Sequence, residues 1–283
     1  MGSGSRRFKD KLAYGLGMLC IAVATVPLFS ILFEVVRNGI GAISFQFLIS
    51  PPGVFGQAGG GIANAIQGTI ILLALASAIA VPFGLLSGVY LAEFGDNGYG
   101  RTVRFLNDVL SEFPSIVIGI LVYSIIVLAM GGFSATAGAI ALSIIMLPII
   151  TRTTEESIKL VPSSIRDAGL ALGIRRWRAT ISIVLSTARG GVITGILLAI
   201  ARVSGETAPL LLTVLGSSFF FNGLNQPVAA LPLTIYRDAN VPYAFARQQG
   251  WGAALVLILM VLGLNIGVRL ATSGRYKFLR SRI

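Results

Sequence analysis

Long apolar stretches alternate with short charged segments along this chain. A helix crosses the hydrocarbon core of a bilayer with about 20 apolar residues, and inside lipid it satisfies its own backbone hydrogen bonds. The stretch 113–151 contains 39 residues without a charge and is interrupted at 131–134, which predicts two spans in a tight hairpin, the first beginning near Phe105. The pattern therefore predicts six spans in total, and the other four lie at 12–36, 64–92, 186–215 and 251–271.

The basic residues lie mainly in alternate connections between these spans. Of the 22 lysines and arginines, 18 lie in segments 1–11, 93–104, 152–189 and 269–283. The opposite connections hold only Arg37, Arg237 and Arg247. Because cytoplasmic connections carry the excess of Lys and Arg in multi-span proteins, we expect a multi-pass protein of the cell (inner) membrane with both termini in the cytoplasm.

Composition excludes several classes of protein. Hydrophobic residues make up 55% of the chain and charged residues 12%, whereas soluble domains carry about 25% charged residues. The net charge of +11 lies in the connections, so it indicates contact with membrane lipid and no nucleic acid. The chain has no histidine and one cysteine, Cys20. Disulfide frameworks and histidine-based catalytic or metal sites are thereby excluded, and no metal site is expected.

Arg202 and Glu206 are the only charged residues in segment 190–236. A charge near the bilayer centre costs about 2.5–3.5 kcal/mol on insertion scales, so such a residue usually faces a polar pathway or a partner. Four residues apart on a continuous helix, the two side chains are predicted to lie one turn apart on one face. A planar guanidinium suits carboxylate or phosphate-like oxyanions, and nearby Ser204 and Thr207 carry hydroxyls. These four residues are the predicted substrate pathway.

The same two charges have an alternative explanation. They could form a structural ion pair that holds the fifth span against a neighbour, because intramembrane ionisable groups often pair. The two interpretations are compatible if Glu206 neutralises Arg202 at rest and an anion displaces it. Asp108 and Glu112, near the cytoplasmic start of the third span, are more simply explained as interfacial partners of Arg101 and Arg104 than as a gate.

The longest cytoplasmic connection, 152–185, contains a short predicted helix at 165–172. Ser164 and Asp167 fit a capping box, and Gly173 fits a C-terminal stop. A helix of about two turns is marginal alone in water, so its apolar face needs a surface to pack on. That surface is either a cytoplasmic partner or the chain's own span ends, and the spacing leaves both open. The face consists of Ile165, Ala168, Gly169 and Leu172.

The run from Asp167 to Leu185 resembles the EAA loop of ABC importer permeases, whose pattern is EAA-x3-G-x9-I-x-LP. Asp167 and Gly169 replace the usual Glu and Ala, and Ser186 stands where the family usually has proline. In that family the loop docks into a groove of the ATP-hydrolysing subunit. The resemblance therefore implies a coupling role for six residues, namely Ile165, Asp167, Ala168, Gly169, Leu172 and Gly173.

Further segments narrow the resemblance. Segments 114–119, 201–210, 231–236 and 251–255 are similar to phosphate importer permeases, and the last two, with Tyr243 and the basic tail, look most like the PstA type. The resemblance implies the type I ABC importer permease fold, which is all-α with six transmembrane helices and a cytoplasmic coupling helix. It implies four partner subunits: a homologous PstC-type permease, two PstB-type ATPases and a PstS-type phosphate-binding protein.

These observations predict the permease subunit of an ATP-driven phosphate importer. The chain has no Gly-x4-Gly-Lys-[Ser/Thr] loop, so we expect no enzyme and no cofactor of its own, with ATP used by the partner ATPase. Alternatives are a permease for sulfate or molybdate, or a secondary anion transporter, which would need no docking loop. Three parts are expected: the first span and its flanks at 1–63, a transmembrane core at 64–272 with its EAA loop at 156–186, and a basic tail at 273–283.

Overall fold

The computed structural model describes residues 3–54 and 59–280, with side chains described for 9–54 and 59–272. Within these residues five helices are long and apolar enough to cross a membrane. A sixth crossing is a bent pair, α4 (Gly98–Glu112) followed by the segment Ser115–Met130. The predicted all-α membrane fold with six spans is confirmed when this pair is counted as one span. The five unbent helices are α1 (Ser3–Gly39), α3 (Ala63–Phe94), α7 (Ala135–Lys159), the α9–α10 unit (Arg176–Ser204) and α13 (Ala244–Arg280).

Shorter elements connect these spans. Segment Ser115–Met130 comprises α5 (Ser115–Val122), the π-helical turn η2 (Tyr123–Val127) and α6 (Leu128–Met130). The α9–α10 unit comprises α9 (Arg176–Ala179), a second π-helical turn η3 (Thr180–Val184) and α10 (Leu185–Ser204). The others are the 3-10 helix η1 (Ile40–Ala42), α2 (Phe45–Ile49), α8 (Ser163–Ala171), α11 (Ala208–Thr213) and α12 (Leu231–Ala239).

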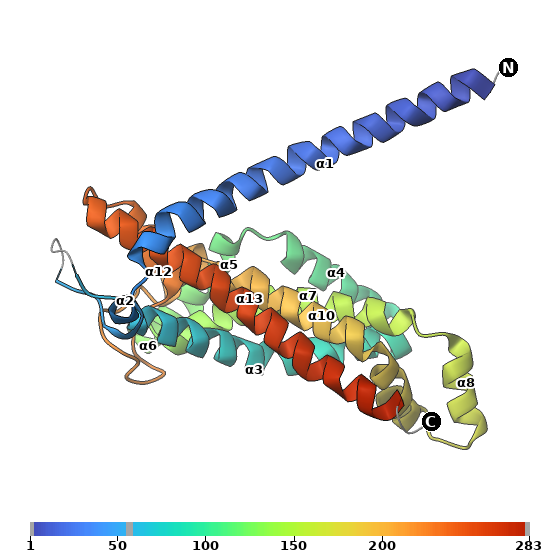
Figure 1. Ribbon diagram of the computed structural model, residues 1–283. Coiled ribbons are helices and arrows are strands. Elements are labelled where there is room, and N and C mark those ends of the chain that lie inside the picture. The colour runs from blue at the N-terminus through green and yellow to red at the C-terminus, as the bar shows by residue number, and fades with distance from the viewer. Residues whose placement is uncertain (1–2, 55–58, 281–283) are drawn as a thin grey trace.

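Small residues let α3 and α7 pack closely in the centre of the bundle (Figure 1). A Cβ on Gly84 would lie 2.8 Å from the Ile150 side chain, and one on Gly88 would lie 2.6 Å from the Thr151 carbonyl oxygen. In lipid, helices associate through such close backbone approach rather than through a hydrophobic force. The main buried core lies here, formed by side chains of α3, α7, α10 and α11.

Helix α1 projects away from the bundle and meets it only near its C-terminal end (Figure 1). At this end a Cβ on Gly39 would lie 2.7 Å from the Trp251 carbonyl oxygen of α13. Most apolar side chains along α1 are exposed, among them Ile21 at 62% and Phe29 at 66%. In a membrane this surface contacts lipid or another subunit, since it is too apolar for water.

The third span differs from the prediction. It does not begin near Phe105, because the chain bends by 103° between α4 and the segment Ser115–Met130. Phe113 ends α4 in an extended conformation, and Pro114 precedes the first residue of α5. Proline disfavours helical backbone at the residue before it and lacks an N–H donor, so a helix tends to stop there. Helix α4 is therefore an amphipathic helix that lies at a sharp angle to Ser115–Met130 within this bent crossing.

The connection after α11 folds back onto the bundle. The amide of Ala135 donates to the Gln226 carbonyl oxygen, and the amide of Leu231 donates to the Thr69 hydroxyl. Val228 and Ala229 are buried, whereas Phe219 is exposed. This connection therefore covers the N-terminal ends of α3 and α7.

The N-terminal end of α1, the C-terminal end of α13 and helix α8 all lie toward one end of the molecule (Figure 1). The connection 214–230 and helix α2 lie toward the other end. This arrangement is the one that six crossings require, since an even number of crossings returns the chain to its starting side.

Candidate functional site

Arg202 and Glu206 form an ion pair, with Arg202 Nη1 2.6 Å from Glu206 Oε1. The Glu206 side chain is 11% exposed and the Arg202 side chain 56% exposed. One N–H of the guanidinium is used in this contact, and a guanidinium has five. The carboxylate is therefore sheltered inside the chain, while the cation lies on an open face with donors left for another oxyanion.

The pair was predicted to lie on one continuous helix, and the structure contradicts this. Helix α10 ends at Ser204, and Glu206 and Thr207 lie between it and α11. The predicted single helix over 186–215 is wrong for a local reason. Pro209 has no N–H to donate and its ring clashes with the carbonyl four residues earlier, that of Gly205. A broken span results, and the amide of Glu206 donates instead to the Val203 carbonyl oxygen.

The packing of α7 against α10 sets the depth of Arg202. A Cβ on Gly191 would touch Ser157, and a Cβ on Gly195 would touch Thr153. The two helices therefore run antiparallel, and each step of one residue forward along α10 corresponds to one residue backward along α7. Extending this register places Arg202 at the level of Met146, which is near the middle of α7. Arg202 thus lies near the midplane of the bundle, where a charge is expensive in lipid.

The two predicted hydroxyl residues are placed differently. Ser204 is buried, and its hydroxyl donates to the Ala201 carbonyl oxygen of its own helix. Thr207 is half-buried in the break between the helices, where its hydroxyl faces the Gly205 carbonyl oxygen at 3.4 Å. Of the two hydroxyls, that of Thr207 lies nearer to solvent and that of Ser204 serves the helix end.

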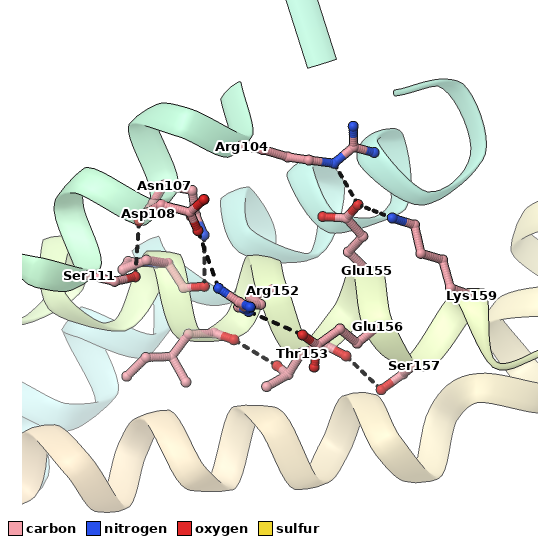
Figure 2. A network of polar contacts seen from close by, with 12 residues as sticks. Arg104, Asn107, Asp108, Ser111, Arg152, Thr153, Glu155, Glu156, Ser157 and Lys159 are labelled. Carbon is pink, nitrogen blue, oxygen red and sulfur yellow. Dashed lines mark hydrogen bonds and ion pairs between the residues drawn. The ribbon is translucent and has the colours of Figure 1, made fainter. Parts of the chain in front are cut away.

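A charged network that the sequence pattern did not predict lies at the C-terminal end of α7 (Figure 2). Glu155 accepts from Arg104 Nε of α4 at 2.7 Å and from Lys159 Nζ at 2.6 Å. Arg152 contacts Asp108 Oδ1 at 3.3 Å and Glu156 Oε1 at 3.1 Å. These residues surround a cavity of about 210 Å³. The sequence signal for this network is the spacing of Arg152, Glu155, Glu156 and Lys159, which puts them on neighbouring turns of α7.

The network also corrects the partner expected for Asp108. Asp108 pairs with Arg152 of α7 rather than with Arg101 or Arg104. Arg104 instead binds Glu155, and it also donates to the carbonyl oxygens of Leu91 and Gly95 at the end of α3. Helix α4 is thereby tied to both α3 and α7.

The predicted cytoplasmic helix is present as α8, with different boundaries. Its N-cap is Pro162, without a side-chain cap, and Ser164 lies inside the helix, so the predicted capping box is wrong. The predicted C-terminal stop is confirmed, because Gly173 has a φ of +75°. The amide of Ile174 donates to the Gly169 carbonyl oxygen and that of Gly173 donates to Leu170, which is the Schellman arrangement.

The apolar face expected on α8 is divided between two surfaces. Gly169 is buried, and a Cβ there would lie 2.8 Å from Ile183 Cδ1. Ile165 packs on the core formed by the ends of the spans nearest to α8. Ala168 and Asp167 are exposed, and Leu172 is 80% exposed. The predicted packing on the chain's own span ends is therefore seen for one side of α8, while the other side is open and docking to a partner stays a prediction.

At the opposite end of the molecule, Arg237 and Asp238 lie in the last turn of α12 and line a cavity of about 120 Å³, and Arg237 also lines one of about 560 Å³. Arg237 Nε lies 2.9 Å from Asp238 Oδ1, and Asp238 is buried. Burial raises the pKa of the Asp238 carboxyl above its ordinary value, although the hydrogen bond and charge of Arg237 oppose the rise. In the part of the chain that is described, no three His, Cys, Asp or Glu side chains gather as a metal site would require.

Comparisons with known proteins agree with this architecture. Residues 80–273 match the family of binding-protein-dependent transport system inner membrane components. A phosphate transport system permease protein PstA from Yersinia pestis is 44% identical over 268 residues, which cover 93% of this chain and 90% of that protein. A probable PstA from Methanocaldococcus jannaschii is 37% identical, with 94% of both chains covered.

The fold is also found in solved transporters. The MetNI methionine ABC transporter in an inward-facing conformation contains a chain that aligns with a TM-score of 0.62 at 16% identity, covering 75% of this chain and 96% of that one. An amino acid ABC transporter aligns with a TM-score of 0.52 at 18% identity, covering 74% and 92%. Together with the family match, these likenesses establish the type I ABC importer permease fold. The chain belongs to the family of binding-protein-dependent transport system inner membrane components, on the branch of the PstA permeases.

Proposed function

We propose that this chain is the permease subunit of an ATP-driven phosphate importer and forms half of its translocation pathway. The permease relatives from Yersinia pestis and Methanocaldococcus jannaschii are named for phosphate transport and are similar over nearly the whole chain. The observation that carries the proposal is the ion pair of Arg202 and Glu206, which lies near mid-depth with its cation on an open face.

An anion that leaves water for a low-dielectric passage loses favourable hydration unless a cation replaces it. Arg202 supplies that cation at mid-depth, and its fork-shaped guanidinium matches the oxygens of phosphate. Glu206 compensates the charge of Arg202 when the passage is empty. Because the contact between them uses one N–H of the guanidinium, phosphate can join the carboxylate on the remaining donors, so that Arg202 is paired both before and after phosphate binds.

The open face at Arg202 supports a second permease as a partner. A side chain that is 56% exposed at this depth would meet lipid if the chain worked alone. A PstC-type permease would cover this face and complete the pathway, with Arg202, Glu206 and Thr207 on this chain's side. Ser204 contributes by closing the end of α10.

Energy for transport would come from ATP hydrolysed by two PstB-type ATPase subunits, and phosphate would be delivered by a PstS-type binding protein. The open side of α8, with Asp167, Ala168 and Leu172, supports docking to an ATPase subunit. Gly173 ends the docking helix, while Ile165 and Gly169 hold it to the permease. This chain would bind no cofactor itself and would lie in the inner membrane with both termini in the cytoplasm. Its transmembrane core would comprise residues 64–272.

The test is uptake of labelled phosphate by the complete complex in proteoliposomes, with sulfate and molybdate as competitors. We expect ATP-dependent phosphate uptake that neither competitor reduces at equal concentration. Uptake of sulfate or molybdate in preference to phosphate would reject the proposed substrate, and uptake without the ATPase subunits would reject the proposed energy source.

A further inference from the structure

Glu93 is a buried carboxylate at the cytoplasmic end of α3 that the substrate pathway does not use. Its side chain is 1% exposed and lies in the last turn of the helix. Removing a carboxylate from water is costly unless it is paired and hydrogen-bonded. In addition, a negative charge at a helix C-terminus opposes the helix dipole. Glu93 therefore requires a hydrogen-bonding, positively charged partner in the folded protein.

That partner comes from the coupling helix. Arg166 of α8 donates to Glu93 Oε1 from Nη2 at 2.6 Å and from Nε at 3.1 Å. The two residues are 73 positions apart in the sequence. Arg166 is 25% exposed and immediately precedes Asp167 of the predicted coupling run. One carboxylate oxygen thus joins the docking helix to a membrane-spanning helix.

The far side of the same loop also holds the end of α3. Arg176, the first residue of α9, donates from Nη2 to the Glu93 carbonyl oxygen at 2.8 Å. Its guanidinium carbon lies 4.8 Å from the centroid of the Phe94 ring. Arg166 lies in α8 and Arg176 lies after the turn that follows α8. The last turn of α3 is therefore hydrogen-bonded to the docking loop both before and after that turn.

Helix α8 is also attached to the membrane part by apolar contacts, and one of them is the packing of Ile165 on the core at the ends of the spans. The close contact of Gly169 with Ile183 connects α8 to η3 and through it to α10. Helix α3 packs along α7 through Gly84 and Gly88, and α7 packs along α10. A displacement of α8 therefore reaches α10 directly through apolar contacts, and it reaches α3 through Arg166 and Arg176.

We propose that Glu93 and Arg166 are positioning residues that transmit movement of the coupling helix to α3, so that α3 and α10 move together during transport. This inference rests on the proposed function, since it assumes an ATPase that moves α8. An ion pair suits the task because its two hydrogen bonds resist both pulling and sliding, whereas the apolar contact at Gly169 permits sliding. Without the pair, α3 would follow α8 only through Arg176 and through its packing on α7, so its movement would fall behind that of α10.

The experiment measures the amount of phosphate transported per ATP hydrolysed, with the complete complex in proteoliposomes. Arg166→Gln breaks the pair but leaves Glu93 buried and unpaired, and that change could prevent assembly. The double variant Glu93→Gln, Arg166→Gln avoids this problem, because two neutral amides can hydrogen-bond to each other. Arg166→Lys keeps the charge but loses the two-bond grip. Arg178→Gln is the matched control, since it removes a cytoplasmic arginine of the same loop that lies over Trp177.

We expect the assembled double variant to hydrolyse ATP while transport per ATP falls roughly tenfold, in line with the loss of charge-assisted hydrogen bonds. Arg166→Lys should give an intermediate ratio, and Arg178→Gln should match the wild type. A wild-type ratio in the assembled double variant would refute the inference. The ratio is measured with whichever oxyanion the wild-type complex carries, so a substrate other than phosphate would reject the proposed function and still leave the link testable.

Discussion

Arg202 and Glu206 are in contact at 2.6 Å although a helix end separates them, with Arg202 in the last turn of α10 and Glu206 beyond it. A carboxylate that lies in a helix break has backbone freedom that a helical one lacks. The pair is therefore held by its own attraction and by the local fold of 204–207, and a competing anion acts against only one N–H···O contact. This arrangement suits a site where substrate must arrive and leave.

The first prediction concerns this cation. Arg202→Gln should abolish phosphate uptake while the complex still assembles, because the anion loses its only cation at mid-depth in the described part of this chain and Glu206 is left to repel it. Arg202→Lys should retain partial uptake, since the charge remains but the planar fork is lost. Uptake is measured in membranes where the mutant complex is shown to be assembled. Near-wild-type uptake by assembled Arg202→Gln would return the pair to a structural role.

The second prediction concerns Glu206. Glu206→Gln leaves the guanidinium without its compensating charge, so phosphate should be held more tightly and released more slowly. We expect the maximal uptake rate to fall more than the apparent affinity changes. Pre-steady-state uptake separates the first turnover from later ones. A variant that loses apparent affinity but keeps its maximal rate would contradict this role.

The third prediction concerns the docking helix. Ala168→Arg places a long cation on the open side of α8 without touching its packed side, so ATPase binding or coupling should fail while the spans remain inserted. Gly173→Leu should have a similar effect for another reason, because Leu is strained at a φ of +75° and the stop of α8 would be lost. Co-purification with the ATPase and ATP-driven uptake are measured together. Normal values for Ala168→Arg would show that this side of α8 is not the docking surface.

The fourth prediction concerns sidedness. In a Cys20→Ser background, a cysteine at Ser164 should be inaccessible to a membrane-impermeant thiol reagent in intact cells, and one at Asn222 should be labelled. Both side chains are exposed in the structure, so a difference in labelling would reflect the side of the membrane on which each lies. Labelling of the Ser164 position from outside would overturn the assigned orientation.

The fifth prediction concerns pH. The pKa of Asp238 is raised by burial above its ordinary value of 3.8, so the folded state binds this proton more tightly than the unfolded state does. The stability from that proton is fully present below the unfolded pKa and is lost as pH rises through the folded pKa. Asp238→Asn should remove this pH-dependent contribution, so the melting temperatures of variant and wild type should diverge as pH rises through that window. Parallel melting curves from acidic to neutral pH would contradict the raised pKa.

Several features of this protein could be predicted from its sequence because they depend on local chemistry. Hydropathy located the long helices, since a lipid-facing segment must be apolar along its whole length. Arg202 and Glu206 stood out because charge is rare in such segments. The stop at Gly173 followed from the left-handed conformation that glycine adopts without strain, and the structure confirms it.

Other predictions failed because a proline opposed the helical tendency of an apolar stretch, and the residue pattern did not show which of the two effects would prevail. Helix propensity over 186–215 favoured one span, but Pro209 breaks it after Ser204. The apolar stretch around Phe113 favoured a straight helix, but Pro114 allows a bend of 103°. In each case the proline was visible in the sequence. Whether a proline breaks a helix depends on whether neighbouring helices compensate for the lost backbone hydrogen bond.

The sequence by itself determined which long segments are apolar enough to lie in the membrane and that Arg202 and Glu206 are charges within one of them, because each of these properties belongs to a continuous stretch of chain. Tertiary structure alone decided which charges pair. Arg104 could have bound Asp108 on its own helix, but it binds Glu155, which is 51 positions away. Glu93 meets Arg166 only because the docking loop folds back on α3. Electrostatic attraction acts through space, so partners of this kind are chosen by packing, after the spans have already been set by hydropathy.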